Sequence, residues 1–187
     1  MLRTPSRILV TLLVIVFVTG CNDDLVTNAS EGSEAEANAC AMVQASPGGS
    51  PGDIASMNGL VAGLDQAWTT GDAVTYAANY AAADWVGPNG AVLNDAAAIE
   101  GLYVFLFSTV LAETTRQSTI RSLTFLSGTI AVLDIDTQVT GYEVPPPGVV
   151  EWAPGIIRAR EKNILVKRGG EWQIVKHQQV LVAPGVP

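Results

Sequence analysis

The spacing of apolar residues changes near residue 116, and this change limits the fold more than any other feature of the chain. Before it, apolar residues recur three and four positions apart, as on one face of a helix. After it, apolar and polar residues alternate, as in strands with one buried face, over segments 118–126, 129–142, 156–168 and 171–182. The short connections among these segments favour antiparallel pairing. Helices followed by a run of strands predict an α+β domain with the helices packed on one sheet face.

The first helix is predicted to begin at Pro51. Ser50 is a suitable cap, proline suits the first helical position, and Asp53 stands three residues after the cap. One apolar stripe then follows at spacings of three and four, made of Ile54, Met57, Val61, Leu64 and Trp68. Gly71 should end this helix, and Asp72 should cap a shorter helix that reaches about residue 80.

Two further elements are predicted between residues 85 and 113. Residues 85–92 are typical of two short strands about a tight turn, with Asn89 and Gly90 at positive φ. Asn94 or Asp95 should cap a third helix that extends to about residue 113. Because segment 102–107 is apolar on every side, we expect this helix to be the most buried one.

Residues 1–20 have the features of a secretory signal peptide. Arg3 and Arg7 precede an apolar run, residues 8–18, that is too short to cross a bilayer as a helix. Residues 18–21, Val-Thr-Gly-Cys, resemble the lipobox of bacterial lipoproteins, in which the peptidase cuts before a lipidated cysteine. The resemblance implies that Cys21 carries a lipid anchor and that the protein resides in the cell envelope, outside the cytoplasm. The alternative is ordinary cleavage, which leaves Cys21 an unmodified thiol.

Residues 21–50 are predicted to form a disordered acidic tether, and residues 51–187 the folded domain. The tether has five acidic residues, no basic one, and the Gly- and Pro-rich stretch 46–50. Low hydrophobicity with one sign of charge cannot offset the entropy cost of ordering the chain. The tether also holds Cys40, a lone thiol if Cys21 is lipidated and a candidate disulfide partner if it is not.

Charge and residue content exclude several function classes. The net charge is −8, and removal of residues 1–20 takes away two basic residues and no acidic one. Such a chain is a poor partner for nucleic acid, and only the lipid anchor would hold it on a membrane. One histidine and no cysteine in the domain cannot supply the usual zinc ligands, so we expect no metal and no cofactor. The sequence also has no Ser/His/Asp triad, phosphate-binding glycine loop or dinucleotide fingerprint.

Two rows of charge fall on the alternating segments. Asp134 and Asp136 alternate with apolar residues, and in the next segment Arg158, Arg160 and Lys162 share one face. An exposed ladder of opposite charges across neighbouring strands explains both rows, each pair contributing at most about 1 kcal/mol. The alternative is an anion-binding site on the arginine row.

Three motifs in the right order resemble the SnoaL-like, nuclear transport factor two-like superfamily, and within it the SgcJ/EcaC-type, or DUF4440-type, branch. The first is Leu-Asp-Gln-Ala-Trp-Thr-Thr-Gly-Asp at residues 64–72, similar to the junction of the first two helices in that group. The second is the hairpin Asp-Trp-Val-Gly-Pro-Asn-Gly at 84–90. The third is Lys-Arg-Gly-Gly-Glu-Trp-Gln-Ile-Val at 167–175, similar to the last hairpin. The resemblance covers about residues 53–183.

The resemblance implies a cystatin-like, cone-shaped roll in which N-terminal helices pack on a curved antiparallel sheet and leave a pocket between them. The group includes ketosteroid isomerase, cyclases and dehydratases, and also proteins that only bind a ligand or dimerise, so the fold does not give the function. This chain departs from the isomerase pattern, since the position of the catalytic base falls on Gly87 and the first helix has no tyrosine. Tyr103 stands where the SgcJ/EcaC-type relatives often carry histidine.

The sequence therefore favours a small-ligand-binding or homodimerising module over an enzyme. Candidate ligand-binding residues are Trp85, Tyr103, Trp152, His177 and Gln179. Trp152 lies in the proline-rich loop 145–155, where it would either close the pocket mouth or cover a bare edge of the core. The alternative function is an isomerase-, cyclase- or hydrolase-like enzyme that uses Asp84, Tyr103 and His177. A cavity that contains all three would favour the enzyme, and one occupied by Leu102, Phe105 and Leu106 would favour binding.

Overall fold

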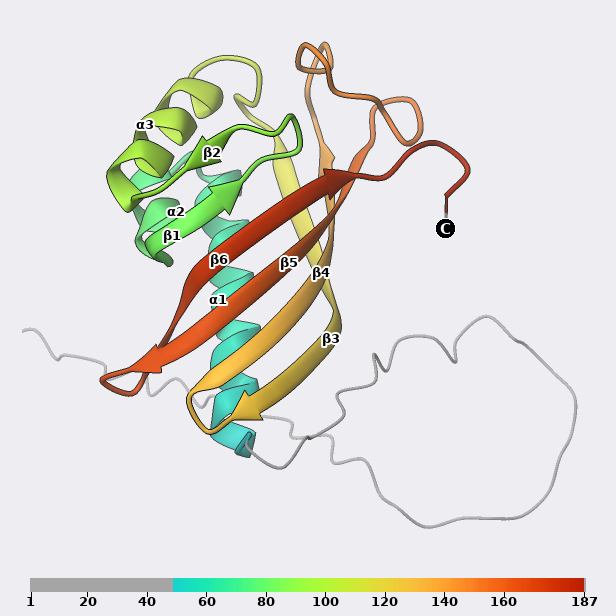
Figure 1. The fold of residues 1–187 in the computed structure, drawn as a ribbon. Coiled ribbons are helices and arrows are strands. Elements are labelled where there is room, and N and C mark those ends of the chain that lie inside the picture. The colour runs from blue at the N-terminus through green and yellow to red at the C-terminus, as the bar shows by residue number, and fades with distance from the viewer. Residues whose placement is uncertain (1–48, 187) are drawn as a thin grey trace, which may run out of the picture. The chain divides into compact units, whose positions relative to one another are not determined.

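The computed structural model describes residues 49–186, so Cys21, Cys40, the predicted signal peptide and nearly all of the predicted tether lie outside the described residues. The described chain consists of helices packed on one curved, six-stranded sheet with the strand order β2-β1-β6-β5-β4-β3 (Figure 1). The elements are α1 (Pro51–Thr69), α2 (Ala73–Ala78), β1 (Tyr80–Val86), β2 (Val92–Leu93), α3 (Ala96–Phe107), β3 (Thr115–Ser127), β4 (Ile130–Thr140), β5 (Ile157–Arg168) and β6 (Glu171–Leu181). The predicted α+β class and the four long strands are confirmed.

Helix α1 begins with the predicted capping box. The Ser50 hydroxyl accepts a hydrogen bond from the Asp53 amide, and the Asp53 carboxylate accepts one from the Ser50 amide. Asp53 also receives bonds from Lys167 Nζ at 2.7 Å and from the indole N–H of Trp172 at 2.9 Å. Lys167, with the Ser50 and Trp172 bonds, holds the pKa of this carboxyl well below its usual range. One side chain therefore both caps α1 and fixes the helix start to the hairpin of β5 and β6.

The sheet wraps α1 with one face and presents the other face to solvent (Figure 1). Alternate residues of the long strands point to the helix, and Leu133, Ile135, Leu165 and Ile174 are fully buried there. They pack with Met57 and the rest of the predicted α1 stripe in one core cluster. Ile54, at the start of the stripe, is only partly buried.

The sheet is mixed, which corrects the expectation of a purely antiparallel one. Strands β3 to β6 form an antiparallel meander, but β1 pairs in parallel with β6, with Trp85 opposite His177. Short antiparallel segments adjacent in sequence are easily recognised, whereas a parallel pair needs a long crossover. Here the crossover comprises α3 and strands β2 to β5, so the sequence pattern of β1 alone did not reveal its partner.

Helix α3 differs from its prediction in both length and burial. It begins after the Asp95 cap as expected but ends at Phe107, six residues early, and only Ile99 and Tyr103 are buried. Val104 is 54% exposed and Phe105 is 60% exposed, so α1 and not α3 is the more buried helix. Apolar side chains on every side of α3 indicated a buried helix, but only one of its sides is covered, mainly by α2 and to a lesser extent by β1.

Of the two residues predicted to have positive φ in the first hairpin, only one does. Gly90 has φ +82°, but Asn89 does not have positive φ. The Gly90 amide bonds to the Gly87 carbonyl at 3.0 Å, so residues 87–90 form the turn, with Pro88 at its second position. Proline at this position suits both common turn types, and the negative φ of Asn89 excludes the one that needs positive φ at the third position. Gly71, at φ +68°, ends α1 as predicted.

Within residues 49–186, we find no helix whose length and apolar content would let it cross a bilayer.

Candidate functional site

A mainly apolar cavity of about 360 Å³ lies between α3, the first hairpin, the sheet and the loop that connects β4 to β5. Its apolar wall comes from α3, the segment between α3 and β3, the sheet and the proline-rich loop. Lining residues of these kinds are Leu102, Phe105, Leu106, Val110, Leu111, Val139, Pro146, Pro147, Val149, Ile157 and Leu181. The polar or amphipathic residues in the wall are Trp68, Trp85, Asn89, Tyr103, Thr137 and Gln179. None of the described lining residues carries a carboxylate, imidazole, amine or guanidinium group.

Tyr103 contributes the end of a buried tyrosine cluster to this wall. Its hydroxyl lies 3.3 Å from the Tyr76 hydroxyl, which is 3.2 Å from that of Tyr80. Burial raises the pKa of all three phenols, and raises those of Tyr80 and Tyr103 most strongly. A phenol in this environment stays protonated, so Tyr103 is not a base near neutral pH. It donates its proton to the Tyr76 hydroxyl, which leaves its oxygen as an acceptor toward the cavity.

Trp85 forms a wall of the cavity with its ring held on both sides. The indole stacks on the His177 imidazole with ring centroids 5.5 Å apart and planes 10° apart. A Cβ added at Gly87 would lie 2.6 Å from the Trp85 Cη2 atom, so only glycine lets the indole lie here. Gly87 is the position that the resemblance assigns to the base of the isomerase, and the indole occupies the space that a side chain there would need. Among the described residues, the buried Trp85 indole N–H has no hydrogen-bond partner.

His177 lies behind Trp85 and does not line the cavity. Its Nδ1 atom is 2.8 Å from the side-chain oxygen of Asn163, which is fully buried. Burial lowers the pKa of His177 to about 4, because the charged imidazolium would lose its hydration. The ring is therefore neutral near pH 7 and serves as a packing surface for Trp85.

Asp84 points away from the cavity. Its half-exposed carboxylate pairs with Lys176 of the neighbouring strand β6. Of the three residues proposed for an enzyme, the structure places only Tyr103 in the cavity wall.

Trp152 does not line the cavity, and its contacts are with the C-terminal segment and Arg158. Its indole N–H donates to the Val186 carbonyl at 3.1 Å, and the Arg158 guanidinium lies 3.6 Å from the ring centroid. The same loop does reach the cavity, but through Pro146, Pro147 and Val149. Of the predicted ligand-binding residues, Trp85, Tyr103 and Gln179 line the cavity, and Trp152 and His177 do not.

A buried ion pair beneath the cavity was missed by the sequence analysis. The Arg116 guanidinium contacts both carboxylate oxygens of Glu161 at 3.0 Å and Asp65 Oδ1 at 2.7 Å. Gln179 joins this network to the cavity, because its amide donates to Glu161 at 3.4 Å and also lines the wall. The alternation of β5 in the sequence could have indicated this pair, because it places Glu161 and Asn163 on the same face as Ala159 and Leu165, which are buried.

The predicted ladder of charges is confirmed on the outer face of the sheet. Lys162 pairs with Asp134 at 2.6 Å, and Asp136 lies 3.4 Å from Arg160 and 3.5 Å from Arg121. These groups are partly exposed, so each pair contributes at most about 1 kcal/mol to stability. Within the described residues, no cluster of three or more His, Cys, Asp or Glu side chains has the geometry to hold a metal ion.

Similarity to solved structures supports the same fold. A domain of unknown function with a cystatin-like fold from Nostoc punctiforme superimposes with a TM-score of 0.62 at 17% identity, covering 73% of this chain and 82% of that one. A ketosteroid isomerase-like protein from Erwinia carotovora gives a TM-score of 0.57 at 18% identity, covering 72% of this chain and 100% of that one. An NTF-2 like protein of unknown function from Shewanella oneidensis gives 0.55 at 17% identity, covering 68% and 98%.

No protein-family profile and no curated protein sequence matches the chain. The structural identities are all low, so the likeness establishes a shared fold and not a shared activity. The described domain has the cystatin-like, nuclear transport factor two-like fold.

Proposed function

We propose that this domain binds a small, mainly apolar molecule in the cavity lined by α3, Trp85 and the proline-rich loop, and that it does so without catalysis. The observation that supports binding is the cavity itself, whose volume of about 360 Å³ is in the usual range for small-molecule sites. Its wall is largely apolar and offers only a few polar groups, among them the Tyr103 hydroxyl and the Gln179 amide. Such groups would orient a ligand that carries one or two oxygen atoms.

The absence of a base from the described wall favours binding over an isomerase or a hydrolase. General acid–base catalysis needs a group that titrates near the working pH and lies within hydrogen-bond reach of the substrate. Asp84 pairs with Lys176 on the surface, His177 lies behind Trp85, and Tyr103 keeps its proton. The remaining alternative is that the domain serves as a homodimerising module. Light scattering of the purified protein would test it, and a monomer mass would count against it. Within the superfamily, the three sequence motifs favour the SgcJ/EcaC-type branch.

Binding in the cavity is testable with prodan, a neutral naphthalene ketone whose emission moves to the blue in apolar surroundings. We expect saturable binding to the purified protein, with a dissociation constant on the order of 10 μM. Leu106→Trp should weaken binding at least about tenfold, because the larger ring fills the cavity.

The control for the filled cavity is Val104→Trp, the same kind of enlargement on the exposed side of α3. Its affinity for prodan should equal that of the wild type. No blue shift on the wild type, or an equal loss in Leu106→Trp and Val104→Trp, would contradict the proposed site. Conversion of the ketone by the wild type would contradict the non-catalytic assignment.

The proposed location of the domain is the cell envelope, by way of a lipid on Cys21. The support is the short apolar run that ends in Val-Thr-Gly-Cys, in residues outside the described part of the structure. Cells fed an acyl-chain probe should label the wild-type protein, and Cys21→Ser should abolish the label and release the protein from membranes or leave it uncleaved. Cys40→Ser is the matched control and should keep the label. An unlabelled wild type would contradict the anchor.

A further inference from the structure

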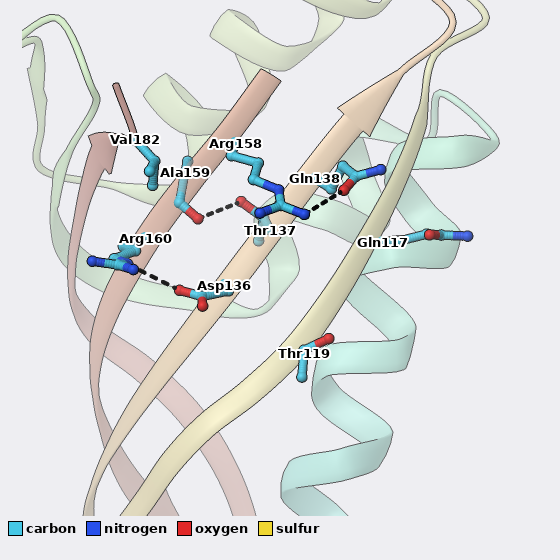
Figure 2. A pocket seen from close by; sticks show the side chains of 9 residues that line it. All are labelled: Gln117, Thr119, Asp136, Thr137, Gln138, Arg158, Ala159, Arg160 and Val182. Atoms are coloured by element: carbon cyan, nitrogen blue, oxygen red, sulfur yellow. Dashed lines mark hydrogen bonds and ion pairs between the residues drawn. The ribbon is translucent and has the colours of Figure 1, made fainter. Parts of the chain in front are cut away.

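A second depression, of about 290 Å³, lies on the opposite face of the sheet from α1. Arg116 on β3 faces α1, where it bonds Asp65, so its neighbours Gln117 and Thr119 belong to the other face. Figure 2 shows these two side chains on β3, Gln138 on β4, and Arg158 and Arg160 on β5, all around one hollow. The wall of this outer pocket combines amide, hydroxyl and guanidinium groups with the apolar side chains of Ala159 and Val182, so it is more polar than the apolar cavity.

The charge of the outer pocket is positive although the chain as a whole is acidic, with a net charge of −8. Asp136 is the only carboxylate among the described lining residues, and both Arg121 and Arg160 lie within 3.5 Å of it. Neighbouring Asp134 is already paired with Lys162. Within residues 49–186, no carboxylate lies within ion-pair distance of Arg158. Asp136 therefore carries one negative charge beside two positive ones, and no neighbouring carboxylate of the described residues balances the charge of Arg158.

Arg158 is held in position without being charge-paired. Its guanidinium lies 3.6 Å from the centroid of the Trp152 ring, a cation–π contact, and its Nη2 atom makes a long hydrogen bond of 3.5 Å to Gln138. A guanidinium has five donors in a planar fork, so several remain for a ligand. Stacking on an aromatic ring fixes the plane of the fork, and this reduces the entropy that a bidentate contact would lose.

The polar groups around Arg158 are suited to hydroxyl groups. Among the described residues, no hydrogen bond engages the side chains of Gln117 and Thr119, which are exposed at the rim of the pocket. An amide and a hydroxyl each both donate and accept, as do the hydroxyl groups of a sugar. A simple anion such as phosphate would use the arginine but leave most of the volume and these groups without contacts.

We propose that the outer pocket is a second binding site, which takes a small hydroxylated carboxylate such as a sugar acid. The carboxylate pairs with Arg158, which is positioned by Trp152, and the hydroxyls bond to Gln117, Thr119 and Gln138. This assignment does not depend on the apolar cavity. Thr137 and Ala159 border both pockets, but the side chains that the proposal uses line only the outer one.

The test is isothermal titration of the purified protein with D-glucuronate, with D-glucose as the neutral match and inorganic phosphate as the simple anion. We expect glucuronate to bind with a dissociation constant of about 0.1–1 mM, and glucose and phosphate to bind at least about tenfold more weakly. Arg158→Gln should weaken glucuronate binding at least about tenfold, and Arg158→Lys about threefold to tenfold, because lysine keeps the charge but loses the fork. Arg168→Gln, at an exposed position of the same strand outside the pocket, should leave binding unchanged.

Three outcomes would overturn the proposal. The first is no saturation by glucuronate up to about 10 mM. The second is equal affinity for phosphate, or an equal loss in Arg168→Gln, which would indicate a general attraction of the basic face for anions. The third is a wild-type dimer that Arg158→Gln converts to monomer without any glucuronate binding, which would make this face an interface between copies. Glucuronate should not displace prodan, and this result would separate the outer pocket from the apolar cavity.

Discussion

Replacing Glu161 by glutamine is expected to lower the free energy of unfolding by about 3 kcal/mol, because Arg116 loses its buried counter-charge. Both side chains are almost fully buried, and the carboxylate contacts the guanidinium through both oxygens. Removing one partner of a buried pair costs about 3–5 kcal/mol, since the remaining charge is left without hydration or a partner. Asp65 still contacts Arg116 at 2.7 Å, so the lower end of that range applies. Urea unfolding followed by tryptophan fluorescence measures the change.

Lys162→Gln is the matched control on the same strand, since it breaks the exposed pair with Asp134. Its effect should stay below about 1 kcal/mol. The double variant Arg116→Met, Glu161→Leu should recover most of the loss, because it removes both of the fully buried charges. The Asp65 carboxylate that remains is partly exposed and keeps two hydrogen bonds from Ser118. A loss below about 1 kcal/mol in Glu161→Gln would show that water reaches the pair and that it is not buried in solution.

Local sequence signals predicted those parts of the fold that depend on neighbours in the chain. The capping box of Ser50 and Asp53, the end of α1 at Gly71 and the four long strands follow from contacts within a few residues. The charge ladder was also predictable, because alternation places Asp136 and Arg160 on one face of adjacent strands. Each of these inferences needs only the local conformation and the next element.

The rest of the fold depends on which elements meet across the domain. The parallel pairing of β1 with β6 joins residues about ninety positions apart, and no local pattern specifies it. The exposure of Phe105 could not be inferred from α3, because an apolar helix at the rim of a cavity has the same composition as one in a core.

The candidate site could be predicted only in part, for a similar reason. The motif that contains Trp85 and the position of Tyr103 pointed to the cavity wall, and both residues line it. The chemistry of Asp84 and His177 made both residues candidates for a catalytic site, but strand alternation places Asp84 on the face opposite Trp85. His177 is on the cavity side of β6, yet the indole of Trp85 covers it. Glu161 was overlooked because a lone acid in an alternating strand is usually solvated, and its partner Arg116 comes from another strand.

The stability of the domain is expected to fall by about 3 kcal/mol as the pH drops from about 6.5 to about 4, because His177 is buried in its neutral form. The folded state lowers the pKa of His177 from 6.5 to about 4, so in this range the unfolded chain binds a proton that the folded domain does not. The stability contributed by the neutral ring is complete above about pH 6.5 and is lost as the pH falls toward the folded pKa. Its surroundings explain the direction of the shift. The ring touches Asn163, Trp85 and Tyr80, none of them charged, while the more distant Glu161 and Arg116 have opposite influences.

His177→Gln isolates this contribution, since glutamine does not titrate and keeps an amide within reach of Asn163. The unfolding free energies of wild type and variant, measured in urea at about pH 7.5 and about pH 4.5, should converge as the pH falls, with their difference shifting by about 2–3 kcal/mol in favour of the variant. The folded domain also lowers the pKa values of the Asp53, Asp72 and Asp134 carboxyls. The stabilisation from these groups is present above their unfolded pKa of 3.8 and is lost only at lower pH. Because the wild type and His177→Gln both contain these three aspartates, the aspartates leave the difference in unfolding free energy between the two proteins unchanged. A pH-independent difference, or an NMR titration that places the His177 pKa near 6.5 in the folded protein, would show that the ring is hydrated, and the rigid Trp85 wall of the cavity would lose its support.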